Sequence, residues 1–163
     1  MKKIKTMMAM MLALVSMCVA FSACSSSSDD SKQADAAAIA GTYVGNLSCT
    51  VSTSTSTVEN ASFIIEKVDD SHVNVTLPAF GEAPMALPSI KVEKLSVTES
   101  NGTYSIPEST FDQTIKVNGN DKNISNTAIK ATVKDGKLTI NFSMKYGSMP
   151  FSMICSCENA TKK

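Results

Sequence analysis

Alternation of hydrophobic and polar positions is clearest toward the carboxy terminus of the chain. In KLTINFSMKY, residues 137–146, apolar side chains occupy every second position from Leu138 to Tyr146. The segment MPFSMICSC, residues 149–157, repeats the pattern after a Gly147-Ser148 connection. A period of two is typical of a β-strand with one buried face. The two segments therefore predict a β-hairpin.

The same pattern predicts a series of further strands. We expect them at 41–51, 62–68, 72–77, 90–97, 103–106, 111–117 and 127–134. The apolar phase changes between Val92 and Leu95, as a β-bulge would cause. Asn101-Gly102, Asn118-Gly119 and Asp135-Gly136 are hairpin-turn signals. Eight or nine short antiparallel strands, in a chain rich in Thr, Ser, Val and Ile, predict a closed barrel or a sandwich.

The first 23 residues have the layout of a secretory signal peptide. Lysines near the start precede an apolar run from Met7 to Phe21, and small residues follow. A run of about 15 residues is shorter than the roughly 20 that a permanent membrane helix needs, although a retained anchor is the alternative. Phe21-Ser22-Ala23-Cys24 resembles the lipobox of bacterial lipoproteins. The resemblance implies that Cys24 is acylated and becomes the first residue of the mature chain.

Residues 24–38 are expected to form a lipidated cysteine and a disordered tether. The stretch SSSSDDSKQADAAA is small, polar and without apolar periodicity. Serines and acids directly after the cysteine resemble the export signal of surface lipoproteins in gut anaerobic bacteria. That resemblance implies the outer membrane and the cell surface. The alternative is a solvated spacer that carries no address.

Composition limits what the remaining domain, residues 39–159, can recognise. The chain has no arginine, and all of its 15 basic residues are lysines. Removing residues 1–23 removes three of these lysines, which leaves twelve against fifteen acidic residues and a net charge of −3. Without guanidinium groups or a basic, aromatic-rich patch, a nucleic-acid partner is not expected. The membrane, through the lipid anchor, is the one partner that the sequence indicates.

Three segments together resemble a known family. They are GTYVGNLSCTV, VNVTLPAFGEAPMALPSIKVEKLSV and IKATVKDGKLTINFSM. Their Gly-x-Tyr-x-Gly start, Phe-Gly break and final alternating hairpin are similar to the calycin-like β-barrel domain of bacterial lipoproteins. The resemblance implies an all-β, antiparallel, up-and-down barrel of about eight strands, related in shape to lipocalins.

The sequence offers little for catalysis, so an enzyme is not expected. His72 is the only histidine and falls on the polar face of its strand. Asp69 and Asp70 lie in a turn, where solvated acids are usual. No phosphate-binding glycine loop, HExxH motif or CxxC motif is present, so no cofactor and no metal are expected.

Cysteines remain as candidates for covalent chemistry. Cys49 lies on the first predicted strand, and Cys155 and Cys157 lie on the last. If these strands pair to close a barrel, Cys49 lies beside one of the other two, and export favours oxidation. A disulfide, free buried thiols and a metal site are the three alternatives.

The barrel interior is the remaining candidate for binding. A barrel of about eight strands is either filled by its own side chains or holds one small ligand. Aromatic residues are the candidates for contact with a small, mostly apolar ligand: Tyr43, Phe80, Phe142, Tyr146 and Phe151. The alternative is a non-enzymatic interaction or structural module of the envelope with a filled barrel. The sequence identifies neither the ligand nor a protein partner.

Overall fold

The structure is a computed structural model that describes residues 32–33, 35–83 and 86–163. None of the helices in these residues is long and apolar enough to cross a membrane. The elements in chain order are β1 (Lys32–Gln33), the 3-10 helix η1 (Ala36–Ala38), β2 (Gly41–Val51), β3 (Ser54–Lys67), β4 (His72–Leu77), β5 (Ile90–Ser96), β6 (Thr98–Ser100), β7 (Thr103–Ser109), β8 (Gln113–Val117), β9 (Asn120–Lys134), β10 (Lys137–Tyr146) and β11 (Met153–Lys162).

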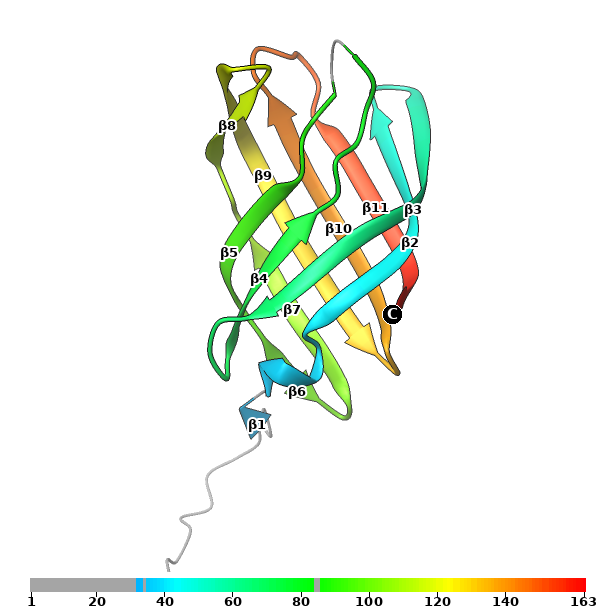
Figure 1. The fold of residues 1–163 in the computed structure, drawn as a ribbon, viewed down its shortest axis with the longest axis vertical. Coiled ribbons are helices and arrows are strands. Elements are labelled where there is room, and N and C mark those ends of the chain that lie inside the picture. Colours follow the sequence, from blue (N-terminus) through cyan, green and yellow to red (C-terminus); the bar gives the residue numbers. More distant parts are fainter. Residues whose placement is uncertain (1–31, 34, 84–85) are drawn as a thin grey trace, which may run out of the picture.

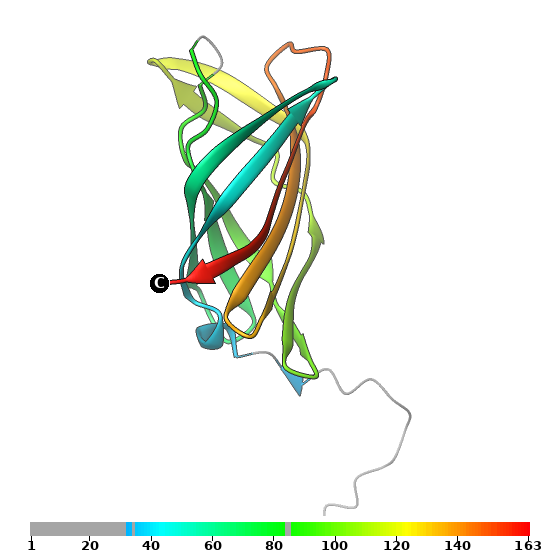
Figure 2. The same ribbon diagram turned by 90° about the vertical axis from the view of Figure 1, so that its right-hand side faces the viewer.

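The strands form a tall, nearly closed antiparallel barrel (Figures 1 and 2). Neighbours in the chain pair from β2 to β5 and from β9 to β11, and β11 pairs with β2. Both β7 and β8 pair with β9, along different halves, so together they act as one interrupted wall strand. The predicted all-β, up-and-down barrel is confirmed.

The wall closes at one end and parts at the other. β5 pairs with β4. Only Val97 separates β5 from β6, and β6 pairs with β7. This stretch joins the two sides of the wall at the end that carries β1 and β6, which we call the lower end (Figure 1). Toward the upper end no ladder joins β5 to β8 within the described residues. We call this parting the seam.

Strict alternation explains the strands that the sequence predicts best. In β10, Leu138, Ile140, Phe142 and Met144 are at most 3% exposed, while the residues between them are half-buried. Burying a side chain of this size contributes about 1.5–3 kcal/mol. These residues and their counterparts on the other strands form one continuous core inside the barrel.

The predicted turns and bulge are present. Asn118-Gly119 and Asp135-Gly136 adopt positive φ angles at both positions, as the two-residue hairpin turns of β8–β9 and β9–β10 require. Lys94, with φ 55°, is the extra residue of the bulge in β5, and its N–H donates to Asn74 Oδ1 at 3.0 Å. The phase change along residues 90–97 therefore had the expected cause.

Some strand boundaries differ from the prediction. β3 begins at Ser54 and β9 at Asn120, so both are longer than expected, and β11 begins at Met153 rather than at residue 149. The added residues of β3 and β9 are mostly exposed polar side chains, which carry no alternating signal. Phe151 consequently lies before β11 and is 54% exposed, not directed into the barrel.

The folded part begins before Ile39, the boundary that the sequence predicted. Ala36 of η1 is fully buried at the lower end, and its N–H donates to the carbonyl oxygen of Asp70 at 3.0 Å. Asp35 caps η1 by accepting from the N–H of Ala37. The backbone of β1 pairs with β6. The predicted leader and Cys24 lie outside the described residues.

Candidate functional site

A cleft opens at the upper end, between β3 and the connection from β4 to β5. β4 pairs with β3 only along residues 64–67, so residues 56–59 of β3 have no strand partner on that side. The connection folds over this gap and encloses a cleft of about 710 Å³. We call it the rim cleft. Its described lining is mainly apolar and includes Val58, Ala79, Phe80, Ala86 and Leu87. The acidic residues Glu59 and Glu82 also line it.

Phe80 forms the floor of the rim cleft. Its backbone exchanges two hydrogen bonds with Leu87, at 3.1 and 2.8 Å, which hold the connection as a short bridge. The Phe80 side chain is 6% exposed, and its ring meets that of Phe142 edge-on at 6.0 Å. Phe80 therefore lies between the cleft and the interior of the barrel.

The structure separates the predicted ligand-binding residues into two groups. Phe80 and Phe142 contact each other toward the upper end. Tyr146, which is half-buried at the end of β10, and the exposed Phe151 also lie toward this end. Tyr43 lies at the lower end, where its register partners are Phe63 and Lys162.

Tyr43 is committed to the structure of the lower end. It is fully buried, and its hydroxyl donates to the carbonyl oxygen of Ile39 at 2.8 Å. Burial raises the pKa of this hydroxyl. Tyr43 and the Phe80 segment are predicted to lie near one ligand, and the structure does not bring them together.

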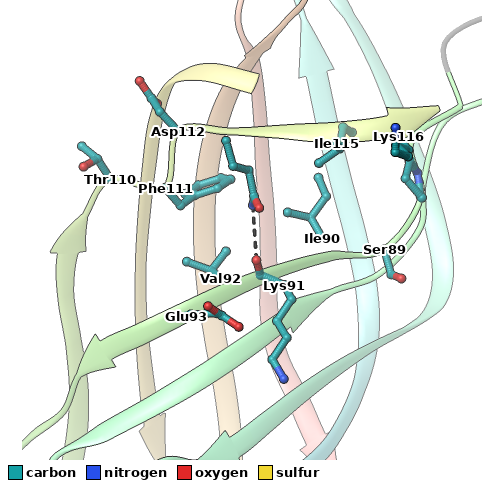
Figure 3. A pocket seen from close by; sticks show the side chains of 12 residues that line it. Ser89, Ile90, Lys91, Val92, Glu93, Thr110, Phe111, Asp112, Ile115 and Lys116 are labelled. Carbon is teal, nitrogen blue, oxygen red and sulfur yellow. Dashed lines mark hydrogen bonds between the residues drawn. The ribbon is translucent and has the colours of Figure 1, made fainter. Parts of the chain in front are cut away.

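A second cleft, of about 630 Å³, occupies the seam between β5 and the segment that leads into β8 (Figure 3). Four apolar side chains point into it from the two walls: Ile90, Val92, Phe111 and Ile115. Gln113 crosses it, because its Nε2 donates to the carbonyl oxygen of Lys91 at 3.2 Å. Asp112 accepts from the hydroxyl of Thr127 at 2.7 Å and so ties this wall to β9.

Gln113 and Lys91 are not among the residues predicted from the sequence, whereas Phe111 is one of the aromatic residues predicted to line the barrel. Pro107 within β7 was an available signal, because proline inside a sheet is confined to edges and irregular positions. The register of β7 on β9 shifts between Ile106 and Ser109. The wall strand is interrupted directly after this point.

The three described cysteines are free and buried, and they cluster where β11 meets β2. Cys155 is directly opposite Cys49, and Cys157 is opposite Leu47. The predicted proximity is thus present through the predicted strand pairing. The hydrogen bond with Cys49 and burial raise the pKa of Cys155, and burial raises that of Cys157.

Asp69, Ser71 and His72 lie together, but not in the arrangement of a catalytic triad. Asp69 Oδ1 and Ser71 Oγ lie 2.8 and 3.1 Å from the same ring nitrogen, Nδ1 of His72. A triad needs the acid and the nucleophile on opposite ring nitrogens. The backbone N–H of Ser71 and the ring of His72 lower the pKa of Asp69 to about 2. These contacts order the turn between β3 and β4.

Comparison with known proteins agrees with this architecture. The model of the family described as calycin-like beta-barrel domain matches residues 39–156. A crystal structure of a putative outer membrane protein from Bacteroides fragilis is similar, with a TM-score of 0.65 and 22% sequence identity. The match covers 80% of this chain and 54% of that one, so the chain spans about half the length of that protein. At this identity the likeness shows the fold alone. None of the curated proteins matches the chain.

Proposed function

Because the chain belongs to the calycin-like β-barrel domain family, we propose that it is a lipid-anchored outer-membrane protein that binds a small, mostly apolar ligand at its upper end. The rim cleft carries this proposal. It combines a volume suited to a small molecule with an aromatic floor and aliphatic walls, the usual composition of small-molecule sites. The ligand would lie against Phe80 rather than beside Tyr43.

Charge restricts the ligand further. Glu59 and Glu82 both line the rim cleft, and the described lining has no lysine. Carboxylates near an apolar site disfavour an anionic ligand by like-charge repulsion. We therefore expect a neutral or cationic apolar compound to bind better than a fatty acid or an acidic steroid.

The proposed anchor suits the position of the cleft. The Cys24 lipobox lies a few residues before Lys32, and β1 pairs with β6 at the lower end. The connection from β4 to β5, which borders the rim cleft, lies at the opposite end of the barrel (Figure 1). A chain lipidated at Cys24 would therefore hold the lower end toward the membrane and direct the cleft away from it.

The test is ligand binding by the purified protein and matched variants. A panel of long-chain alcohols, neutral steroids, bile acids and glycans is screened by thermal shift, and hits are measured by calorimetry. We expect a neutral apolar compound to bind and Phe80→Ala to weaken it at least tenfold. Phe63→Ala, which removes a buried ring at the lower end, controls for general loss of packing. Binding of glycans alone, or equal affinities in both variants, would contradict the proposal.

An interaction module is the second candidate, and one observation favours it. Phe151, just before β11, is 54% exposed, and Ile154, at the start of β11, is 63% exposed. Both lie on the outside of the barrel. Contiguous exposed apolar side chains are typical of protein contacts, and Phe151 and Ile154 are the candidates for such a patch. If this is their role, serine at both positions abolishes crosslinking of the protein to an envelope partner while the binding of small molecules is retained.

A further inference from the structure

The seam presents two strand edges that face each other without a ladder between them. β5 is the last strand of the sheet on one side, and β8 has only β9 as a partner. Within the described residues, the Gln113–Lys91 bond crosses this gap where ladder bonds would otherwise lie. A side chain thus takes the place of a backbone neighbour.

Backbone groups on both walls are directed into the seam. The Lys91 carbonyl oxygen accepts from Gln113 and so points away from β4. In an antiparallel ladder the N–H and C=O of one residue point to the same side, so the Lys91 N–H also faces the seam. On β8 the two-residue turn makes Val117 a hydrogen-bonded partner of Asn120. By alternation, the backbone groups of Thr114 and Lys116 then point away from β9 and toward the seam.

The chemistry of the seam suits one more strand. Paired strands lie about 4.8 Å apart, whereas β5 and β8 are separated by a glutamine side chain and a hydrogen bond. The floor is apolar, and the exposed side chains at the margins are of both signs: Lys91, Glu93, Asp112 and Lys116. A strand with alternating apolar and uncharged polar side chains would place the first set on this floor and the second in solvent.

We propose that the seam is a docking site for a short extended peptide of a partner protein, which inserts between β5 and β8 and completes the barrel wall. A peptide in extended form supplies both backbone donors and acceptors at the spacing of the two edges, which is how strands add to exposed edges. Since β5 and β8 run antiparallel to each other, the peptide lies parallel to one wall and antiparallel to the other. The proposal does not depend on the rim cleft.

Lys91 offers a sharp pair of variants. Lys91→Pro removes the N–H that faces the seam, and proline is tolerated where an edge-strand N–H faces outward. Lys91→Thr keeps the N–H but, like the proline variant, loses the 2.7 Å ion pair with Glu66. Only a ligand that hydrogen-bonds to the strand edge distinguishes the two. Thermal unfolding of both variants checks that the barrel is retained.

The probe is a blocked, fluorescein-labelled heptapeptide of alternating threonine and valine ending in lysine, titrated into the full-length protein by anisotropy. We expect saturable binding that Lys91→Pro weakens at least tenfold and Lys91→Thr changes by less than twofold. On the unaltered protein, N-methylation of either alternate set of peptide amides should weaken binding, because one set faces β5 and the other faces β8. This second measurement tests the proposal without Lys91→Pro, in case that variant unfolds.

Four results would overturn the proposal. The first three are the absence of saturable binding, equal affinities for the two Lys91 variants, and insensitivity to N-methylation. A fourth is self-association in the ultracentrifuge that Lys91→Pro abolishes while the peptide does not bind. That outcome would assign the seam to a second copy of the chain.

Discussion

Cys155 of β11 lies directly opposite Cys49 of β2, in the ladder that joins the last wall strand to the first. Opposite residues of an antiparallel pair have Cα atoms about 4.5–5.5 Å apart, within the range of a disulfide. Because exported proteins meet oxidising conditions, we predict that these two thiols form a bridge and that Cys157 stays reduced. Mass spectrometry after thiol alkylation of the exported protein identifies the pair.

The bridge should stabilise the barrel measurably. It would enclose a loop of roughly 100 residues, for which loop entropy alone gives about 4.7 kcal/mol, and disulfides typically contribute about 2–4 kcal/mol. Cys155→Ser should therefore lower the midpoint of chemical unfolding under oxidising conditions and have a smaller effect under reducing conditions. Cys157→Ser is the matched control. Finding all three thiols reduced in exported protein would refute this prediction.

Gly45 allows β2 to approach β11 closely, and an added methyl group has no room. A Cβ at this position would lie 2.8 Å from Ala160 Cβ and 2.8 Å from Cys157 Sγ. Overpacking of this kind costs about 1–3 kcal/mol. We predict that Gly45→Ala destabilises the protein by this amount in urea unfolding. Adding Ala160→Gly to the same chain should recover part of the loss, and its failure to do so would point to another cause.

Asp112 gives the stability of the barrel a defined pH dependence. Hydrogen bonds from the Thr127 hydroxyl and backbone lower the pKa of Asp112 in the folded state. The carboxylate therefore stabilises the fold above its unfolded pKa of about 3.9, and this contribution disappears as the pH falls through the lower folded value. We predict that Asp112→Asn reduces the acid dependence of unfolding between about pH 5 and pH 2.

A pair of variants at Thr127 tests the cause of this effect. Thr127→Val removes the hydroxyl that donates to Asp112, so it should also reduce the acid dependence. Thr127→Ser keeps the hydroxyl and should preserve it. An unchanged pH profile in Thr127→Val would show that the hydroxyl does not control the carboxylate.

Membrane attachment is predicted to depend on one thiol. Because acylation of Cys24 would be the sole lipid attachment indicated by the sequence, Cys24→Ala should release the protein from the membrane fraction. Cell fractionation with detection by antibody measures this. Cys18→Ala, which alters the other cysteine of the predicted leader, is the control. Retention of Cys24→Ala in membranes would contradict the lipid anchor.

Strand positions were predictable where one face is buried along the whole strand. The predicted bounds of residues 72–77 and 137–146 match β4 and β10, because every second side chain enters the core. The first half of β3 was missed because residues 54–60 are exposed or half-buried polar residues and Val58, and their sheet position comes from pairing with β2.

The site was predictable only in part, since it depends on which strands separate. Phe80 was singled out correctly as part of an irregular segment, and it meets Phe142. The pattern could not show that Tyr43 lies at the opposite end of the barrel. Alternation indicates which face of a strand a residue occupies, but not its height along the barrel axis. Nor could it show the seam, which arises where β7 and β8 are interrupted against a continuous β9.

The ladder between β2 and β11 also determines when the protein can fold. The first and last wall strands are neighbours, so closure pairs residues that are more than 100 positions apart, as Cys49 and Cys155 are. Such non-local pairing folds slowly, on the scale of milliseconds to seconds. Until β11 has been synthesised and released, β2 and β10 each expose an unpaired edge. If the chain is exported as proposed, this slow closure would leave it unfolded long enough to pass through a translocation channel.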